Sequence, residues 1–268
     1  MAAMLVSVGK KLDGIQQTQE SILSFLEQDK RAAMQADLNI LTDELRNYKY
    51  NWDNDQYKSN HHMKVLDIKQ SAEKNLIFYQ RQIASAIEKM PSIHGEQAVN
   101  SSVKKLIGLF HDERMALYML AFSSFVEVML LGNFAAEYLA SVAAKVEECD
   151  TRYRSQYAQC RDMIRKYASE TLEKQAMGTL GTLLKKTGNA IASSPVLSKG
   201  PVDEWLEAGG DKLLKSNQEN AEKVAALFDG ERDSGSKRFT DGIKSVERIL
   251  NNTTDLLFDG ENLYLAGA

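Results

Sequence analysis

The sequence has few of the residues that break or cross-link helices. Only 3 of its 268 residues are proline and only 2 are cysteine, and neither glycine nor proline occurs between Gly14 and Pro91. So few cysteines exclude a disulfide-rich fold, and a hydrophobic content of 43% excludes a disordered chain. A net charge of -4 is too small to predict nucleic-acid binding. These absences predict helices packed around a substantial core.

Motifs that carry chemistry are also missing. The sequence contains no GxxxxGKS/T, GxGxxG or GxSxG motif, which a phosphate-binding loop or a hydrolase nucleophile requires. None of the four histidines follows a glutamate by three residues, and HExxH is absent. Cys149 and Cys160 share a predicted helix at about 16 Å, too far apart for a disulfide. We therefore predict a protein that is not an enzyme and holds no metal or cofactor.

Apolar residues recur every three or four positions in two early runs, from Leu12 to Leu26 and from Met34 to Trp52. This spacing predicts a helix that presents one stripe to another helix, as in a coiled coil. The equal steps of four residues on either side of Lys30 amount to a stutter, so the coiled-coil-like seam is imperfect. We predict that the second run forms a partner-binding seam. Its members are Leu38, Leu41, Leu45, Tyr48 and Trp52.

The stretch 47–62 is rich in asparagine, aspartate and tyrosine, which is typical of a turn. The helical stripe resumes at Met63, continues to Ile87 and is ended by Pro91. Either the chain folds back at 47–62 into a helical hairpin, or residues 13–90 form one rod of about 115 Å. The sequence leaves both alternatives open.

The most apolar part of the chain runs from Met115 to Ala144 and contains only Glu127 and Glu137 as charged residues. A short helix over 99–110 is expected before it, with Asp112 as a cap for the apolar helix. A charged, periodic stretch over 145–175 follows it. One long helix could include both the apolar and the charged stretch.

This apolar segment is longer than the roughly 20 residues needed to cross a bilayer. Its two glutamates each oppose membrane insertion, however, and a helix that is apolar all round is also typical of the centre of a helical bundle. We favour the buried central helix over a membrane-inserting segment. Its main apolar residues are Leu117, Leu120, Phe122, Phe125, Val126, Leu130, Leu131 and Phe134.

The texture of the sequence changes at Gly178, because 11 of the 16 glycines lie from there to the end. We place a boundary near residue 176, between a long-helix module (1–176) and shorter helices and loops that pack on it (177–268). No alternation of period two is long enough to predict a strand. The expected elements are helices over 177–191, 203–208, 212–228 and 239–257, with a loop over 229–236.

These features predict an all-α fold, an elongated helical bundle with long coiled-coil-like helices and a buried central apolar helix. At the N-terminus a short apolar run, Leu5, Val6 and Val8, precedes its lysines. This order is the reverse of a secretory signal, so we expect a cytoplasmic protein. With no catalytic motif, the function we predict is that of an interaction or scaffold protein. It would act through helix–helix assembly with another copy of itself or with a protein partner, and without nucleic acid.

The alternative is a membrane-acting protein. Long amphipathic helices that flank a central apolar element resemble the arrangement of the α-pore-forming cytolysins, over about half of the chain and without a shared motif. This resemblance implies a soluble bundle that shelters residues 115–144 and releases them at a bilayer.

Overall fold

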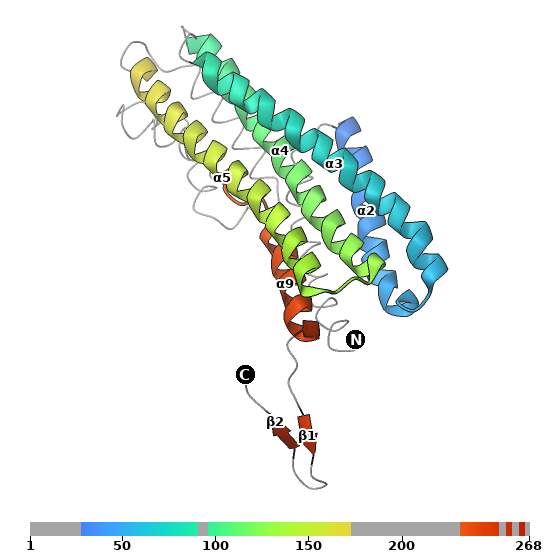
Figure 1. Ribbon diagram of the computed structural model, residues 1–268. Helices are drawn as coiled ribbons and strands as arrows, with labels where there is room; N and C mark the ends of the chain where they lie inside the picture. Colours follow the sequence, from blue (N-terminus) through green and yellow to red (C-terminus); the bar gives the residue numbers. More distant parts are fainter. Residues whose placement is uncertain (1–27, 91–95, 173–230, 252–255, 259–262, 266–268) are drawn as a thin grey trace, which may run out of the picture.

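The computed structural model describes residues 28–90, 96–172 and 231–251 and two short strands. The helices are α2 (Gln28–Asn51), α3 (Asp55–Lys89), α4 (Glu96–Leu131), α5 (Ala136–Leu172) and α9 (Lys237–Asn251). Figure 1 shows the long helices side by side in an elongated bundle. The all-α helical bundle predicted from the sequence is confirmed, whereas regular coiled-coil packing is not.

The chain folds back between α2 and α3, so the hairpin forms and the single rod does not. Asn54 precedes α3 with an extended backbone, and its side chain accepts a hydrogen bond from the backbone N–H of Tyr57 at 3.0 Å. Asp55 adds a negative charge at the first turn, where the helix dipole favours it. The asparagine-rich composition of this stretch therefore stops one helix and caps the next.

Helix α4 runs without interruption through the polar group 111–114, where we expected a break and a cap at Asp112. The prediction of a short separate helix over 99–110 is therefore wrong. No proline interrupts the stretch. His111 and Arg114 also have an acidic partner elsewhere in the fold, Glu231, so polar side chains fit within a buried helix.

The apolar segment 115–144 does not continue into one long helix, because the chain turns between α4 and α5. Gly132 has a φ of 63°, a left-handed conformation that glycine adopts without strain. Its N–H donates to the carbonyl oxygen of Val128 at 3.2 Å, which closes the end of α4. The side chain of Asn133 then accepts from the N–H of Ala135. The single-helix expectation is corrected by this glycine turn.

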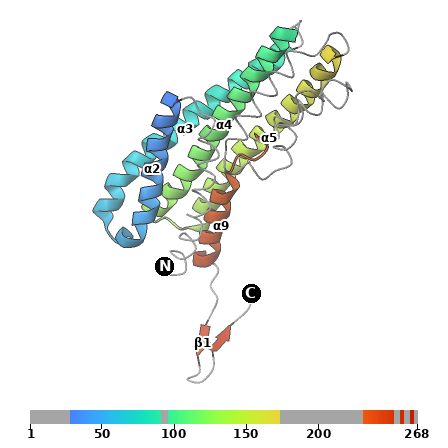
Figure 2. The same cartoon turned by 180° about the vertical axis from the view of Figure 1, so that it is seen from behind.

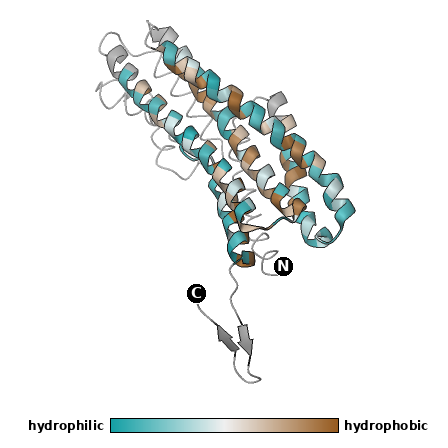
Figure 3. Ribbon diagram, viewed as in Figure 1, coloured by the Kyte–Doolittle hydropathy of each residue, from teal (hydrophilic) through white to brown (hydrophobic). Residues whose placement is uncertain are grey.

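Helix α4 is the centre of the bundle. Every residue from Glu113 to Leu130 is buried, and α2, α3, α5 and α9 all pack against this helix. Figure 3 shows hydrophobic residues along α4 and mainly hydrophilic residues on α3 and α5. Seen from behind, α2 and α9 lie in front of the longer helices (Figure 2). The prediction of a buried central apolar helix is confirmed.

Helix α9 carries the last of the predicted stripes, although it ends at Asn251 and not at residue 257. Its Phe239 stacks on Phe122 of α4 with ring centroids 4.9 Å apart and meets Tyr118 edge-on at 5.1 Å. Such aromatic pairs add to the burial that holds α9 on the core.

Leu257 lies in a short hairpin instead of a helix. Strand β1 (Leu256–Phe258) pairs antiparallel with β2 (Leu263–Leu265), with Leu257 opposite Tyr264. Strands of three residues are too short to show the alternation that identifies a strand in a sequence. The predicted boundary near residue 176 and the predicted helices over 177–191, 203–208 and 212–228 lie outside the described residues.

We predict opposite effects for alanine at two glycines of α4 and its turn. Gly132→Ala should destabilise the protein by about 1 to 2 kcal/mol, because a left-handed backbone conformation is strained for alanine and unstrained for glycine. A Cβ would meet nothing within 4 Å at either Gly132 or Gly108, so crowding contributes to neither change. Gly108→Ala, within the helix, should instead stabilise by up to about 1 kcal/mol. Urea unfolding measures both, and equal effects would contradict the assignment of the turn.

Candidate functional site

The predicted partner-binding seam lies mostly inside the molecule. Leu38, Leu41, Leu45 and Tyr48 are at most 2% exposed and belong to the core that surrounds α4. Trp52, the last member, lies in the turn after α2 and is 40% exposed. The stripe therefore packs α2 onto its own chain, and only its Trp52 end is open to another molecule. A role of these residues in partner binding stays a prediction.

Most of the exposed large hydrophobic residues belong to segments at one end of the bundle. Of the seven that are exposed among the described residues, five belong to segments that Figure 1 shows at the lower end of the molecule. They come from the end of α2 and its turn, the start of α3, the last residue of α4 and the last turn of α9. We call these residues the apolar end: Tyr50, Trp52, Met63, Leu131 and Ile249.

Polar contacts hold the segments of the apolar end in place. The Asn251 side chain donates from Nδ2 to the carbonyl oxygen of Phe134 at 2.9 Å, which ties α9 to the turn between α4 and α5. Lys69 of α3 forms an ion pair with Glu127 near the end of α4, and His62 Nε2 lies 3.6 Å from the same carboxylate. These contacts therefore hold the segments of the apolar end in fixed positions relative to one another.

Sequence reasoning missed most of the apolar end. Met63 and Leu131 continue periodic apolar runs, so nothing in their spacing marks them as exposed. Ile249 instead lies beside the stripe that runs through Val246 and Leu250. Tyr50 and Trp52 did give a sequence signal of exposure, since they are large aromatic residues in a polar stretch without an apolar stripe around them. Only the folded arrangement shows that segments far apart in the sequence end together.

The residues of the predicted apolar segment are placed almost entirely in the core. Leu117, Leu120, Phe122, Phe125, Val126 and Leu130 are buried, Phe134 is half-buried in the turn, and Leu131 is 46% exposed. Glu127, one of the two charges that opposed a membrane span, is buried and neutralised by Lys69. The other, Glu137, is exposed at the start of α5. The bundle thus accommodates both charges without a bilayer.

A second buried carboxylate joins α4 to the segment before α9. Glu231 accepts from His111 Nδ1 at 2.8 Å, and Arg114 Nη1 lies 3.7 Å away. Burial alone would raise the pKa of the Glu231 carboxyl, but His111 and Arg114 together lower it, so the ionised form is favoured. The hydroxyl of Tyr153 on α5 donates to the backbone carbonyl of Glu231. One residue therefore links three parts of the fold.

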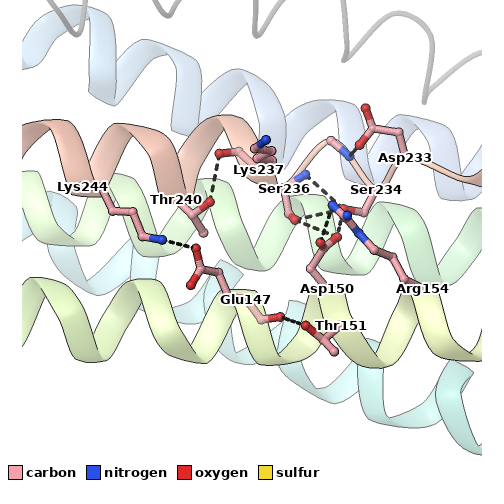
Figure 4. A network of polar contacts seen from close by, with 11 residues as sticks. Glu147, Asp150, Thr151, Arg154, Asp233, Ser234, Ser236, Lys237, Thr240 and Lys244 are labelled. Carbon is pink, nitrogen blue, oxygen red and sulfur yellow. Dashed lines mark hydrogen bonds and ion pairs between the residues drawn. The ribbon is translucent and has the colours of Figure 1, made fainter.

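The loop from Glu231 to Ser236 is fastened to α5 by a further polar network (Figure 4). Asp150 accepts from the hydroxyls of Ser234 and Ser236 at 2.5 and 3.2 Å, and Arg154 pairs with its second oxygen at 2.7 Å. Lys244 of α9 forms an ion pair with Glu147 one turn earlier on α5. These contacts confirm the predicted loop before the last helix and fix how α9 meets α5.

Both cysteines are free thiols. This agrees with the prediction that Cys149 and Cys160 are too far apart on one helix to form a disulfide. Burial raises the pKa of Cys160 to about 12 and also raises that of Cys149, so neither thiol ionises readily. Among the described residues, no three histidine, cysteine, aspartate or glutamate side chains come together to hold a metal ion. We assign a cofactor or metal to none of the described residues.

Comparisons with protein families, curated proteins and solved structures give no significant match for this chain. Its function must be argued from its own residues.

We predict that the buried Lys69–Glu127 pair stabilises the bundle far more than an exposed pair does. Lys69→Met should cost about 3 kcal/mol, because it leaves a buried carboxylate without its main partner. Lys145→Met removes the exposed partner of Glu73 and should cost less than about 1 kcal/mol. Denaturant unfolding compares the two. The double variant Lys69→Met with Glu127→Gln should recover stability relative to Lys69→Met, and failure to do so would contradict the pairing.

Proposed function

We propose that this protein is a non-enzymatic interaction protein. It assembles with another copy of itself or with a protein partner, and it does so through the apolar end. The observation that supports this is that five of the seven exposed large hydrophobic residues described, two of them aromatic, belong to segments at the same end of the bundle. Tryptophan and tyrosine are the residues that most often anchor protein–protein contacts.

The flanks of the bundle fit such a contact less well. The only other exposed large hydrophobic residues among those described are Ile77 and Phe78, which lie together on α3. The outward faces of α5 carry ion pairs within the helix, such as Arg152 with Glu148. Charged helix faces of this kind keep a surface solvated, whereas gathered apolar side chains favour association.

The burial of the seam also bears on where a partner would bind. Leu38, Leu41 and Leu45 are already covered by this chain, so a partner could reach them only by displacing α4 or α3. Contact at Trp52 and its neighbours requires no such displacement. We therefore place assembly at the exposed end of the predicted seam and not along its length.

We predict that removing the aromatic residues of the apolar end weakens self-association. Tyr50→Ser combined with Trp52→Ser should raise the Kd of the oligomer by about tenfold or more, because buried aromatic anchors carry much of the energy of such contacts. Sedimentation equilibrium over a range of concentrations measures the change.

The matched control is Phe78→Ser, which removes an aromatic side chain that is 54% exposed on the flank of α3. It should leave the Kd unchanged. A wild-type protein that is monomeric at every concentration would contradict self-association. An equal loss of association in the control would contradict assembly through the apolar end.

One observation favours the membrane-acting alternative. By length and composition, α4 could cross a bilayer over Ser101–Leu131, although the core helix of a soluble protein passes the same test and the most apolar window of this stretch is almost entirely buried. Insertion would require α4 to leave the helices that surround it.

Vesicles separate the two functions. On the interaction proposal, the wild-type protein stays in the supernatant when it is centrifuged with anionic liposomes and releases no entrapped dye. Sedimentation with the liposomes together with dye release would favour the membrane alternative and contradict the proposal.

A further inference from the structure

Glu113 is an acid enclosed at the centre of the bundle. Its side chain is fully buried on α4, where this helix packs against α3 and α5. Gln80 of α3 faces it, and Gln156 of α5 donates from Nε2 to the backbone carbonyl of Gln80 at 3.2 Å. The carboxyl group therefore lies beside the place where α3 and α5 are joined across α4.

Glu113 forms no well-oriented hydrogen bond, although the Gln80 amide lies close to its carboxyl group. Both oxygens of Glu113 are buried without a partner, and so are Nε2 of Gln80 and Oε1 of Gln156. The other buried glutamates among the described residues differ in this respect. Glu44 is bonded to His61 and Tyr57, Glu127 to Lys69, and Glu231 to His111. Of these four described glutamates, Glu113 alone is paired with no basic side chain.

The charged and titratable groups around Glu113 do not supply one either. Arg114 and His111, its neighbours on α4, are engaged by Glu231. Gln80 on α3 carries no charge. Among the described residues, Tyr153 of α5 interacts with Glu113, and the other titratable groups around Tyr153 besides Arg114 are Tyr157 and Glu231. Asp112 is the neighbour of Glu113 on α4. These groups are neutral or acidic.

We propose that Glu113 is a proton-binding site in the core, and that a proton bound there stabilises the packing of α3, α4 and α5 as the solution becomes acidic. A neutral carboxyl needs no counter-ion in an apolar interior. The neutral form also gains a hydroxyl donor, whereas the ionised form can only accept hydrogen bonds.

The direction of the pH dependence follows from the two states of the chain. Burial raises the pKa of Glu113 from 4.5 to about 7, and Gln80 opposes this rise without reversing it. Between these values the folded protein keeps a proton that the unfolded chain has released. Stability from this group is therefore complete below the unfolded pKa and is lost as the pH rises to the folded one, by about tenfold in the unfolding constant per pH unit.

Urea unfolding of the full chain tests the proposal with wild type, Glu113→Gln and Glu148→Gln. The ratio of the unfolding constant of wild type to that of Glu113→Gln should rise about a hundredfold between about pH 5 and about pH 7, then level off. Glutamine has the shape of the neutral acid and cannot titrate, so its own profile lacks this component. Glu148→Gln, at an exposed ion pair, should keep the wild-type profile.

Infrared spectroscopy of the wild-type protein gives a second measurement that does not depend on any variant. A protonated carboxyl band should persist in the folded protein until about pH 7 and disappear on unfolding at the same pH. Parallel unfolding profiles for wild type and Glu113→Gln, or a folded protein without such a band at about pH 6, would overturn the proposal.

Discussion

The enclosure of α4 is the constraint on which the rest of the structure depends. From Glu113 to Leu130 every side chain is buried, so this part of the helix has no face exposed to water. Burial of one large apolar side chain contributes on the order of 1.5 to 3 kcal/mol, and this stretch contains many of them. The surrounding helices need only one apolar stripe each, because their task is to cover α4. The amphipathic spacing of these helices and the central position of α4 both follow from the need to cover the apolar surface of α4.

A helix buried on every side also constrains the charges around it. Glu44 joins α2 to α3 through His61, Glu127 joins α3 to α4 through Lys69, and Glu231 joins α4 to the segment before α9 through His111. Each pair spans two different elements. A helix that slipped by one residue would leave a buried carboxylate unpaired, which costs several kcal/mol. These pairs therefore fix the alignment of helices whose apolar contacts alone would tolerate sliding.

The sequence was sufficient for the helical class and for the buried central element, since both follow from periodicity and from the scarcity of glycine and proline. It also placed the hairpin turn near Asn54 as one of two alternatives. It failed at Gly132, where a single left-handed residue divides the apolar segment, and at 111–114, where distant Glu231 makes polar residues acceptable in a core helix. The failure at 111–114 concerns a partner that is distant in the sequence, whereas Gly132 and Asn133 form a local turn signal that the apolar run outweighed. The apolar end was missed for the first of these reasons, since its segments lie far apart in the sequence.

The interaction proposal and the proton-binding site both assume that α4 stays covered by its own chain in solution. Amide hydrogen exchange measured by mass spectrometry tests this assumption most directly. Peptides within 113–130 should exchange only on global unfolding, far more slowly than the α4–α5 turn at 132–135. If the peptides of α4 instead exchange as fast as that turn under native conditions, the helix is not enclosed and the account is wrong.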